Sequence, residues 1–316
     1  MFCTSIIPTV GRETLRRAVR SVLDQNFSEA DYEVIVVNDS GLPLAVADWQ
    51  HSPRVKVVET NHRERCVARN TGAALAKGSY LHFLDDDDWL LPGALDSLWK
   101  LSNQYRDAAW LYGGAVIFDR EDRPVIHLIH RLEANCFTQT MAGEWIPLQA
   151  SLINQTCFHQ IGGFNPLIPG IEDVDLARRM SLYFDFSGTT DMVAGVGLGA
   201  ERSTTNQTRA RLDGREAREL ILDKSGVERR LWHSANNGYW RGRIVRLFLT
   251  SAAWNLAHGK FFTAMSRTLY GTAALLKAIL GSFFNQDFWK AIMSSHESEA
   301  FARRQAERPQ TIGASE

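Results

Sequence analysis

The sequence predicts a doubly wound α/β fold, with a mostly parallel sheet covered by helices on both faces, followed by a helical C-terminal extension. Two observations carry this prediction. Short β-branched runs alternate with amphipathic helices through residues 1–90, and apolar residues recur at helical spacing from residue 212 onward. The 316-residue chain is 45% apolar and 22% charged, which permits a sizeable packed core and gives no sign of disorder.

Four apolar runs near the start are expected to be strands buried on both faces of a parallel sheet. They are CTSIIPT at 3–9, YEVIVVND at 32–39, VKVVET at 55–60 and SYLHFLD at 79–85. Amphipathic helices are expected between them at 12–25 and 65–78. This alternation predicts right-handed βαβ units, whose functional residues gather beyond the carboxyl ends of the strands.

The later pattern is looser and then becomes almost wholly helical. Expected elements are a helix at 92–103, strands at 109–118 and 124–129, a helix beginning near Glu172, and helices at 244–257, 261–284 and 286–293. The chain therefore divides into an α/β domain at 1–210 and a mainly helical extension at 211–316. No uncharged apolar run reaches 18 residues, so a spanning helix is not expected.

Charge is distributed unevenly, although the net charge is only −1. Residues 1–200 carry 17 Lys and Arg against 25 Asp and Glu, whereas residues 201–290 carry 15 against 7. The basic, aromatic-rich second segment suits an anionic membrane surface, on which amphipathic helices can lie. It equally suits a helical bundle packed against the acidic domain, and both interpretations stay open.

The four cysteines (Cys3, Cys66, Cys136 and Cys157) form no CxxC pair and lack the spacing of a metal site, which fits a reducing compartment. The N-terminus runs directly into a short apolar strand, without the long apolar core and cleavage site of a signal peptide. We therefore expect a cytoplasmic protein, peripheral on the inner face of the cytoplasmic membrane, with no nucleic-acid partner.

The strongest site signal is FLDDDDWLLPGAL at 83–95, where an apolar strand ends in four consecutive aspartates. Neighbouring carboxylates repel one another, and more strongly where they are partly buried at a strand end. A hard divalent cation, Mg²⁺ or Mn²⁺, held by one or two carboxylates and a substrate diphosphate would relieve this repulsion. The alternative, a solvated acidic turn, fits less well between an apolar strand and a Trp-Leu-Leu-Pro helix start.

Two further motifs contribute carboxylates. VIVVNDSG delivers Asp39 to the end of a buried strand, where it can accept hydrogen bonds from a nucleobase or ribose, and Gly41 lets the backbone turn sharply. PGIEDVDLARRM at 169–180 opens an amphipathic helix with Glu172 and Asp173. The helix dipole alone favours acidic residues in a first turn, but a general base also needs a carboxylate held rigidly at the edge of a cleft.

With these motifs the sequence resembles the inverting family-2 glycosyltransferases of the GT-A fold. The resemblance covers residues 3–205 and rests on four motifs in order. They are SIIPTVGR at 5–12, VVNDSG at 36–41, ARNTGAALAKGSYLHFLDDDDWLLPGAL at 68–95, and GGFNP followed by GIEDVDLARR within 162–179. Four ordered motifs are far more specific than any one of them. The resemblance implies that residues 1–210 form a GT-A domain that binds a nucleotide sugar.

The resemblance also implies which residues meet the nucleotide. Pro8 and Arg69 would lie near it, and Asp39 would contact the donor base. Many members carry a basic R-x-H element after the last strand of the core. Arg202 stands at that place with a threonine where the histidine often is, and it is a candidate contact to the donor diphosphate.

The resemblance also implies a chemical role for each of the remaining carboxylates. Asp85 and Asp87 would form the DxD pair, with Asp87 the direct metal ligand, and Asp86 could substitute in either role because the run is degenerate. Asp173, supported by Glu172, would be the general base that deprotonates the acceptor hydroxyl.

The implied function is transfer of one sugar, with inversion, from a nucleotide-diphosphate sugar to a saccharide or lipid-linked acceptor in bacterial envelope or exopolysaccharide synthesis. A UDP-sugar is favoured as donor. The Q-x-x-R-W element of processive members is not visible, which argues for one addition per encounter. Two alternatives stay open. A sugar nucleotidyltransferase would need a glycine-rich, basic loop after the first strand, which is missing, and a non-catalytic nucleotide-sugar-binding scaffold would lack the base.

Overall fold

The computed structural model describes residues 1–27, 32–62, 64–168, 170–197, 207–282 and 284–293. The chain forms two compact units. The first consists of Met1–Ala134 and Ile146–Gly214, and the second of Asn135–Trp145 and Arg215–Glu316. Each unit has its own buried apolar core.

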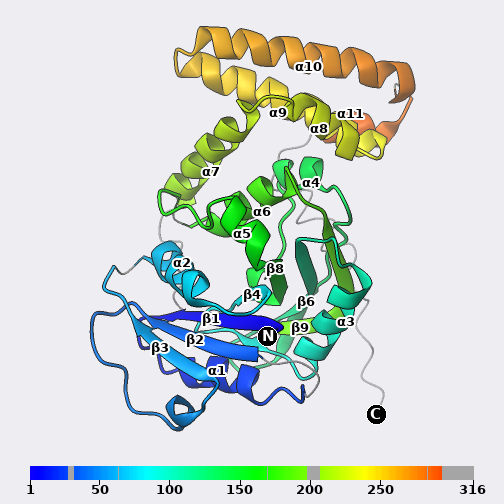
Figure 1. The fold of residues 1–316 in the computed structure, drawn as a ribbon. Coiled ribbons are helices and arrows are strands. Elements are labelled where there is room, and N and C mark those ends of the chain that lie inside the picture. The colour runs from blue at the N-terminus through cyan, green and yellow to red at the C-terminus, as the bar shows by residue number, and fades with distance from the viewer. Residues whose placement is uncertain (28–31, 63, 169, 198–206, 283, 294–316) are drawn as a thin grey trace. The chain divides into compact units, whose positions relative to one another are not determined.

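A nine-stranded sheet forms the centre of the first unit, with the order β3-β2-β1-β4-β8-β6-β9-β5 and with β7 paired to β6 (Figure 1). The strands are β1 (Cys3–Thr9), β2 (Tyr32–Asn38), β3 (Val55–Glu59), β4 (Tyr80–Phe83), β5 (Trp89–Leu90), β6 (Trp110–Phe118), β7 (Pro124–Leu128), β8 (Ser151–Asn154) and β9 (Phe186–Gly197). Strands β3, β2, β1 and β4 are parallel, whereas β8 runs antiparallel to both β4 and β6. The sheet is thus parallel in its first half and mixed in its second.

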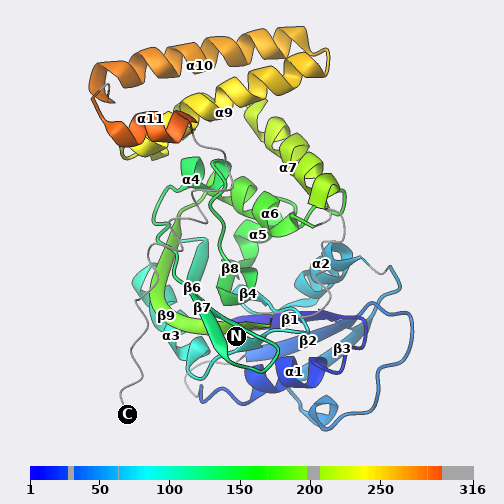
Figure 2. The same cartoon turned by 180° about the vertical axis from the view of Figure 1, so that it is seen from behind.

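Helices cover both faces of this sheet, which confirms the predicted fold class. They are α1 (Leu15–Leu23), α2 (Arg65–Leu75), α3 (Ala94–Gln104), α5 (Gln155–Gln160) and α6 (Glu172–Ser181), with short 3-10 turns η1 (Asp48–His51) and η2 (Leu148–Ala150). Helices α1 and α2 lie on opposite faces of the parallel half (Figures 1 and 2). The buried side of α1 is the predicted apolar stripe, because Leu15, Val19 and Val22 all lie in the core.

The predicted strands of the parallel half agree with β1 to β4 apart from their end residues. Strands β5, β8 and β9 and helix α5 were not predicted. β5 and β8 are very short, and β9 (FSGTTDMVAGVG) is rich in glycine and polar residues. β9 owes its extended form to pairing along β6 rather than to a pattern of its own.

Several glycines of the motifs adopt left-handed backbone conformations, and at Gly41 and Gly163 a Cβ would also meet a neighbouring side chain. Gly41 has a φ of +74°, and a Cβ there would lie 2.3 Å from Asn61 Oδ1, so the turn after β2 requires glycine. Gly163 has a φ of +67°, and its Cβ would lie 2.7 Å from Asn70 Oδ1. The Asn70 side chain clamps Phe164, because Nδ2 donates to the Phe164 carbonyl at 2.8 Å and Oδ1 accepts from its N–H at 3.0 Å. The GGF motif therefore fixes the approach to α6 against α2.

The second unit is helical. Its elements are α4 (Phe137–Met141), the end of α7 (Gln207–Leu222), α8 (Val227–Ser234), α9 (Gly238–Ala257), α10 (Phe261–Ser282) and α11 (Gln286–Met293). α9 packs against both α10 and α11. The early segment 135–145 joins this unit through hydrogen bonds from Thr138 N to Ser234 Oγ at 2.9 Å and from Arg243 Nη2 to the Ala142 carbonyl at 3.0 Å. None of the described helices is both long and apolar enough to span a bilayer.

We expect Gly163→Ala to lower the free energy of unfolding by about 2 kcal/mol or more. The left-handed backbone disfavours a Cβ by roughly 1–2 kcal/mol, and the added methyl would also collide with Asn70 Oδ1. Gly162→Ala is the matched control, because Gly162 has a φ of +83° but a Cβ there would meet no atom within 4 Å. Urea denaturation should show the smaller loss for the control. Equal losses would mean that the Asn70 clamp does not depend on Gly163.

Candidate active site

Three neighbouring parallel strands bring the predicted site residues to one edge of the sheet. β1 ends at Thr9, β2 at Asn38 and β4 at Phe83, and Asp39 and the acidic run at 85–88 follow the last two strands. Because β2, β1 and β4 are adjacent and parallel, their carboxyl ends lie side by side. The motifs thus meet where an α/β sheet collects its ligands.

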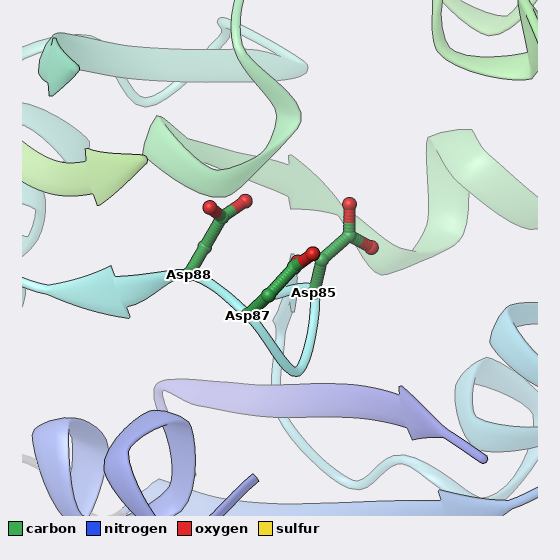
Figure 3. Close-up of side chains that lie close together, drawn as sticks. All are labelled: Asp85, Asp87 and Asp88. Atoms are coloured by element: carbon green, nitrogen blue, oxygen red, sulfur yellow. The ribbon is translucent and has the colours of Figure 1, made fainter. Parts of the chain in front are cut away.

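Three carboxylates of the acidic run form a group (Figure 3). Asp85, Asp87 and Asp88 each offer an oxygen, and these oxygens lie within 4.8 Å of one another. Burial and the Asp85 carboxylate raise the pKa of Asp87. Burial, with the charges of Asp85 and Asp87, raises the pKa of Asp88 well above its ordinary value. The group concentrates negative charge that a cation would neutralise.

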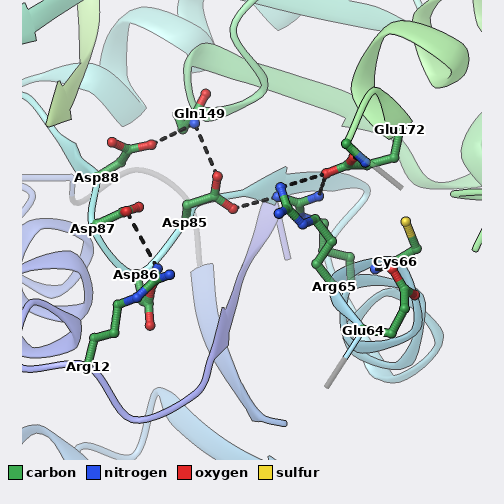
Figure 4. A network of polar contacts seen from close by, with 12 residues as sticks. Arg12, Glu64, Arg65, Cys66, Asp85, Asp86, Asp87, Asp88, Gln149 and Glu172 are labelled. Carbon is green, nitrogen blue, oxygen red and sulfur yellow. Dashed lines mark hydrogen bonds and ion pairs between the residues drawn. The ribbon is translucent and has the colours of Figure 1, made fainter. Parts of the chain in front are cut away.

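Asp86 lies apart from this group. Its buried carboxylate accepts hydrogen bonds from Thr9 Oγ1 at 2.6 Å and from Arg12 Nη1 at 2.7 Å. Arg12 also lies 3.5 Å from Asp87 Oδ2 (Figure 4). Asp86 therefore fastens the loop after β1 to the loop after β4, and Arg12 connects it with the three-carboxylate group.

Gln149, in η2, holds the other side of the group. Its Nε2 donates to Asp88 Oδ2 at 2.6 Å and lies 3.4 Å from Asp85 Oδ2 (Figure 4). The Gln149 carbonyl accepts from His82 Nε2 at 2.9 Å, and Ser5 Oγ lies 3.0 Å from His82 Nδ1. Burial lowers the pKa of His82 to about 4, so the ring is neutral near pH 7 and its Nδ1 accepts from Ser5. A buried chain from β1 through β4 thus positions Gln149.

The buried guanidinium of Arg69 joins the acidic run to α6. Its Nη2 donates to Asp85 Oδ1 at 2.5 Å and its Nη1 to Glu172 Oε1 at 2.8 Å, and Arg65 Nη1 lies 3.3 Å from the same Glu172 oxygen. Burial alone would lower the pKa of Arg69, but Asp85 and Glu172 raise it above its ordinary value. Burial likewise opposes ionisation of Asp85, yet Arg69 holds the pKa of that carboxyl below its ordinary value. These groups form a charged bridge across the site.

Asp173 follows Glu172 in the first turn of α6. Its Oδ1 accepts a hydrogen bond from its neighbour Val174 N at 2.8 Å. Burial and then the charge of Glu172 raise the pKa of Asp173 to about 6. A carboxylate with a pKa close to neutrality is suited to accept and release a proton at physiological pH.

On the predicted nucleotide side, the buried Asp39 carboxylate organises the loop after β3. It accepts hydrogen bonds from Thr60 Oγ1 at 2.8 Å, His62 N at 2.7 Å and Glu64 N at 2.6 Å. Pro8 lies in β1, one residue before its end. Arg202 lies outside the described residues.

Arg12, Asp88 and Gln149, which belong to or directly contact the three-carboxylate group, were not among the predicted site residues. Arg12 stands inside the SIIPTVGR motif and Asp88 inside the acidic run, so both signals were present in the motifs already singled out. Gln149 had no such signal, because it lies 61 residues beyond Asp88 in an unpatterned part of the chain.

The donor set fits a hard divalent cation. Mg²⁺ and Mn²⁺ prefer carboxylate oxygens, and the group formed by Asp85, Asp87 and Asp88 offers three of them. The raised pKa values of Asp87 and Asp88 show that their ionised forms lack sufficient compensation from the neighbouring protein groups. A bound cation would supply that compensation.

The fold and the acidic edge together define an α/β protein of the class that collects ligands at the carboxyl ends of its parallel strands. The chain belongs to glycosyl transferase family 2, whose family model matches residues 4–167, slightly more than half of its length. The matched region contains Asp39, Arg69 and the acidic run and ends before α6. The family predicted from the motifs is thereby confirmed.

Similar proteins include named glycosyltransferases. The chain is 35% identical over 105 residues to the poly(ribitol-phosphate) beta-N-acetylglucosaminyltransferase TarP of Staphylococcus aureus. It is 32% identical over 119 residues to the GalNAc(5)-diNAcBac-PP-undecaprenol beta-1,3-glucosyltransferase of Campylobacter jejuni. These alignments cover 31% and 35% of this chain and only 32% and 37% of the two relatives, so the chain spans about a third of their length.

Solved structures support the fold. The S. aureus TarS fragment 1-349 in complex with UDP-GlcNAc is similar to this chain with a TM-score of 0.58 at 15% sequence identity. The similarity covers 86% of this chain and 89% of that one. The GT-A type α/β fold with C-terminal helices is therefore as predicted.

Arg69→Met should lower the free energy of unfolding by about 3–5 kcal/mol, because Glu172 would stay buried without its closest counter-ion. Arg65→Met is the matched control. Arg65 is about one-third exposed and more distant from Glu172, so its loss should change stability by about 0–1 kcal/mol. Urea denaturation of both variants at neutral pH makes the comparison. A loss for Arg69→Met as small as that of the control would show that the bridge does not organise this site.

Proposed function

We propose that the protein is an inverting, metal-dependent glycosyltransferase that moves one sugar from a nucleotide-diphosphate sugar to an acceptor hydroxyl. One observation carries this proposal. The three-carboxylate group at the end of β4 is tied by Arg69 and Glu172 to the first turn of α6, where the pKa of Asp173 is raised to about 6. The group that would bind the cation is thus linked through ion pairs to the helical turn that carries the proposed base.

In the proposed reaction, Asp173 accepts the proton of the acceptor hydroxyl while the acceptor oxygen attacks the anomeric carbon. Attack comes from the face opposite the diphosphate, which inverts the configuration. A bond forms between the acceptor oxygen and the anomeric carbon, the bond from that carbon to the diphosphate oxygen breaks, and a nucleoside diphosphate leaves. Glu172, held by Arg69, keeps the first turn of α6 in place for this proton transfer.

Asp85, Asp87 and Asp88 would hold the cation, with Asp87, the most exposed of the three, as the principal ligand toward the donor. A bound Mg²⁺ or Mn²⁺ would act as a Lewis acid that stabilises the charge developing on the leaving diphosphate. Arg12, which is partly exposed beside Asp87, would donate hydrogen bonds to the same diphosphate. We propose that Arg202 adds a further contact.

We propose a UDP-sugar as the donor. The similar TarS fragment was solved in complex with UDP-GlcNAc, and the name of TarP specifies transfer of N-acetylglucosamine. Asp39 would hold the loop after β3 against the base, with Pro8 and Arg69 near the nucleotide. Asp86 would act indirectly, by fixing the loop after β1.

We propose that the acceptor is an envelope saccharide or a lipid-linked saccharide. The name of the C. jejuni relative specifies an undecaprenol-diphosphate-linked acceptor, and that of TarP a poly(ribitol-phosphate). A lipid-linked acceptor would place the enzyme in the cytoplasm against the inner face of the membrane. Of the alternatives, the matched family provides no support for a sugar nucleotidyltransferase, and the base distinguishes an enzyme from a scaffold.

The donor site is tested by the melting temperature in the presence of UDP, GDP or UDP-GlcNAc with Mn²⁺, Mg²⁺ or EDTA. A ligand at 100 times its Kd adds about 2.7 kcal/mol of stability, so we expect a metal-dependent rise for the UDP compounds. Asp87→Asn should abolish the metal-dependent part. Asp107→Asn, at an exposed aspartate after α3, is the matched control and should keep it. No rise with any nucleotide would refute the donor site.

Asp173→Asn should lower the rate of sugar transfer about 10²- to 10⁴-fold while nucleotide binding is retained, because an amide cannot accept the proton. Asp185→Asn is the control, since Asp185 is exposed in the loop between α6 and β9. Transfer is measured as release of nucleoside diphosphate in the presence of acceptor. Wild-type transfer by Asp173→Asn would contradict the assignment of the base and favour another carboxylate.

The same assignment fixes the direction of the pH dependence. Asp173 must be ionised to accept a proton, and its pKa is raised to about 6, so the transfer rate should fall about tenfold per pH unit below pH 6. The rate is measured at saturating metal and donor, so that weaker binding at low pH does not contribute to its fall. A rate that stays level down to pH 4.5 would show that Asp173 is not the base.

A further inference from the structure

Helix α10 packs on α9 through only one of its faces (Figures 1 and 2). The buried residues of α10 recur every three or four positions and are mostly small: Ala264, Arg267, Gly271, Ala274 and Ala278. A Cβ on Gly271 would lie 3.1 Å from Leu249 Cδ2, so the two helices approach closely there. The buried stripe therefore accounts for one side of the helix.

The opposite side of α10 is apolar and exposed. Its large side chains are Phe262 (86% exposed), Met265 (59%), Leu269 (64%) and Leu276 (62%), which we name the outer stripe. At about 100° per residue these four side chains fall within an arc of about 60°, centred roughly opposite the buried stripe. Leu256, in the last turn of α9, and Phe261, the first residue of α10, are also exposed. Exposed large apolar side chains gathered on one face of a helix favour an interaction surface.

The charged residues near the outer stripe indicate which kind of partner it binds. Residues 238–293, which span α9 to α11, carry seven Lys and Arg and a single acidic residue, Asp287. Lys260 precedes the stripe and Lys277 follows Leu276. Both lysines are exposed, and their ammonium groups lie over the rings of Trp254 and Trp232, 5.4 Å and 4.3 Å from the ring centroids. Asp287 lies 3.8 Å from Lys290, a basic residue of the same helix. Arg267, on the buried side of α10, pairs with Glu219 of α7 and with Asp223, which directly follows α7, but α9 and α10 themselves contain no acidic residue. Exposed apolar side chains on a helix with exposed lysines and no acidic residue of its own fit an anionic lipid surface.

We infer that the outer stripe of α10 binds the surface of an anionic lipid bilayer. The apolar side chains enter the boundary between headgroups and acyl chains, with Lys260 and Lys277 beside the lipid phosphates. The helix lies along the surface rather than across it, in keeping with the lack of a spanning helix among the described residues. The inference rests on the proposed function in one respect, namely that a lipid-linked acceptor would explain why the enzyme binds a membrane.

A second copy of the chain fits this surface less well. A twofold contact would place the same patch of both copies face to face, and the excess of positive charge over 238–293 would then repel itself. Lipid phosphates attract the same charge. Lipid is therefore the occupant that both the apolar and the basic residues favour.

The test is cosedimentation of the full chain with vesicles of phosphatidylcholine alone or mixed with phosphatidylglycerol. We expect binding to the anionic vesicles, weakened by salt because the lysines contribute through charge. Leu269→Gln should weaken binding about tenfold by removing an apolar side chain from the bilayer boundary. Lys260→Glu combined with Lys277→Glu should abolish the preference for anionic vesicles.

Leu220→Gln is the matched control, because Leu220 on α7 is 66% exposed and receives the same substitution outside the outer stripe. Its vesicle binding should equal that of the wild type. Equal binding by Leu269→Gln and the wild type, or no binding to any vesicle, would overturn the inference. A dimer that forms without lipid and dissociates in Leu269→Gln, with no vesicle binding, would assign the stripe to a second copy instead.

The experiment separates this inference from the proposed transferase activity. Asp87→Asn should bind vesicles like the wild type, since it lies in the first unit. Leu269→Gln should keep the nucleotide-dependent rise in melting temperature. A wild-type protein that binds no vesicle but keeps the nucleotide-dependent rise in melting temperature would refute only the membrane surface. A wild-type protein that binds anionic vesicles but shows no such rise would refute only the donor site.

Discussion

The arrangement of the candidate site depends on one buried ion pair network, in which Arg69 lies between Asp85 and Glu172. Each partner comes from a different element: α2, the end of β4 and the start of α6. A guanidinium taken out of water must keep its counter-ions, because an unpaired buried charge is strongly unfavourable. Asp85 and Glu172 therefore cannot separate from Arg69 without a large loss of stability. The requirement to keep these charges paired fixes the acidic group and the first turn of α6 with respect to one another.

The four consecutive aspartates illustrate how local geometry divides a uniform sequence. Successive side chains on an extended or turning backbone point in different directions, so four neighbouring carboxylates cannot all enter one group. Asp86 turns toward Thr9 and Arg12, while Asp85, Asp87 and Asp88 gather near Gln149. One aspartate thereby fastens two loops, and three remain to form an oxygen-rich donor set.

The sequence predicted those features that depend on short, local stretches of the chain. Strands β1 to β4 have continuous apolar patterns, and Asp39 and the acidic run follow directly from where two of these strands end. The sequence did not predict the contacts made by Gln149, which depend on a short turn folding back over the sheet. Nor did it predict β9, whose glycine-rich sequence becomes a strand through pairing with β6. The helices of the second unit were predictable because their helical spacing is local, whereas the joining of segment 135–145 to that unit is a tertiary contact.

The raised pKa values also connect the proposed metal binding with the proposed proton transfer. Burial and mutual repulsion favour the protonated forms of Asp87 and Asp88, so protons and a divalent cation compete for the same oxygens. Asp173 gains a proton on acidification for a related reason, since burial and the charge of Glu172 oppose its ionisation. Acidification would therefore weaken the proposed cation binding and protonate the proposed base, Asp173, together. Excess metal would restore cation binding, because it competes with protons at the acidic group. It would not restore the ionised form of Asp173, whose titration would then set the remaining pH dependence.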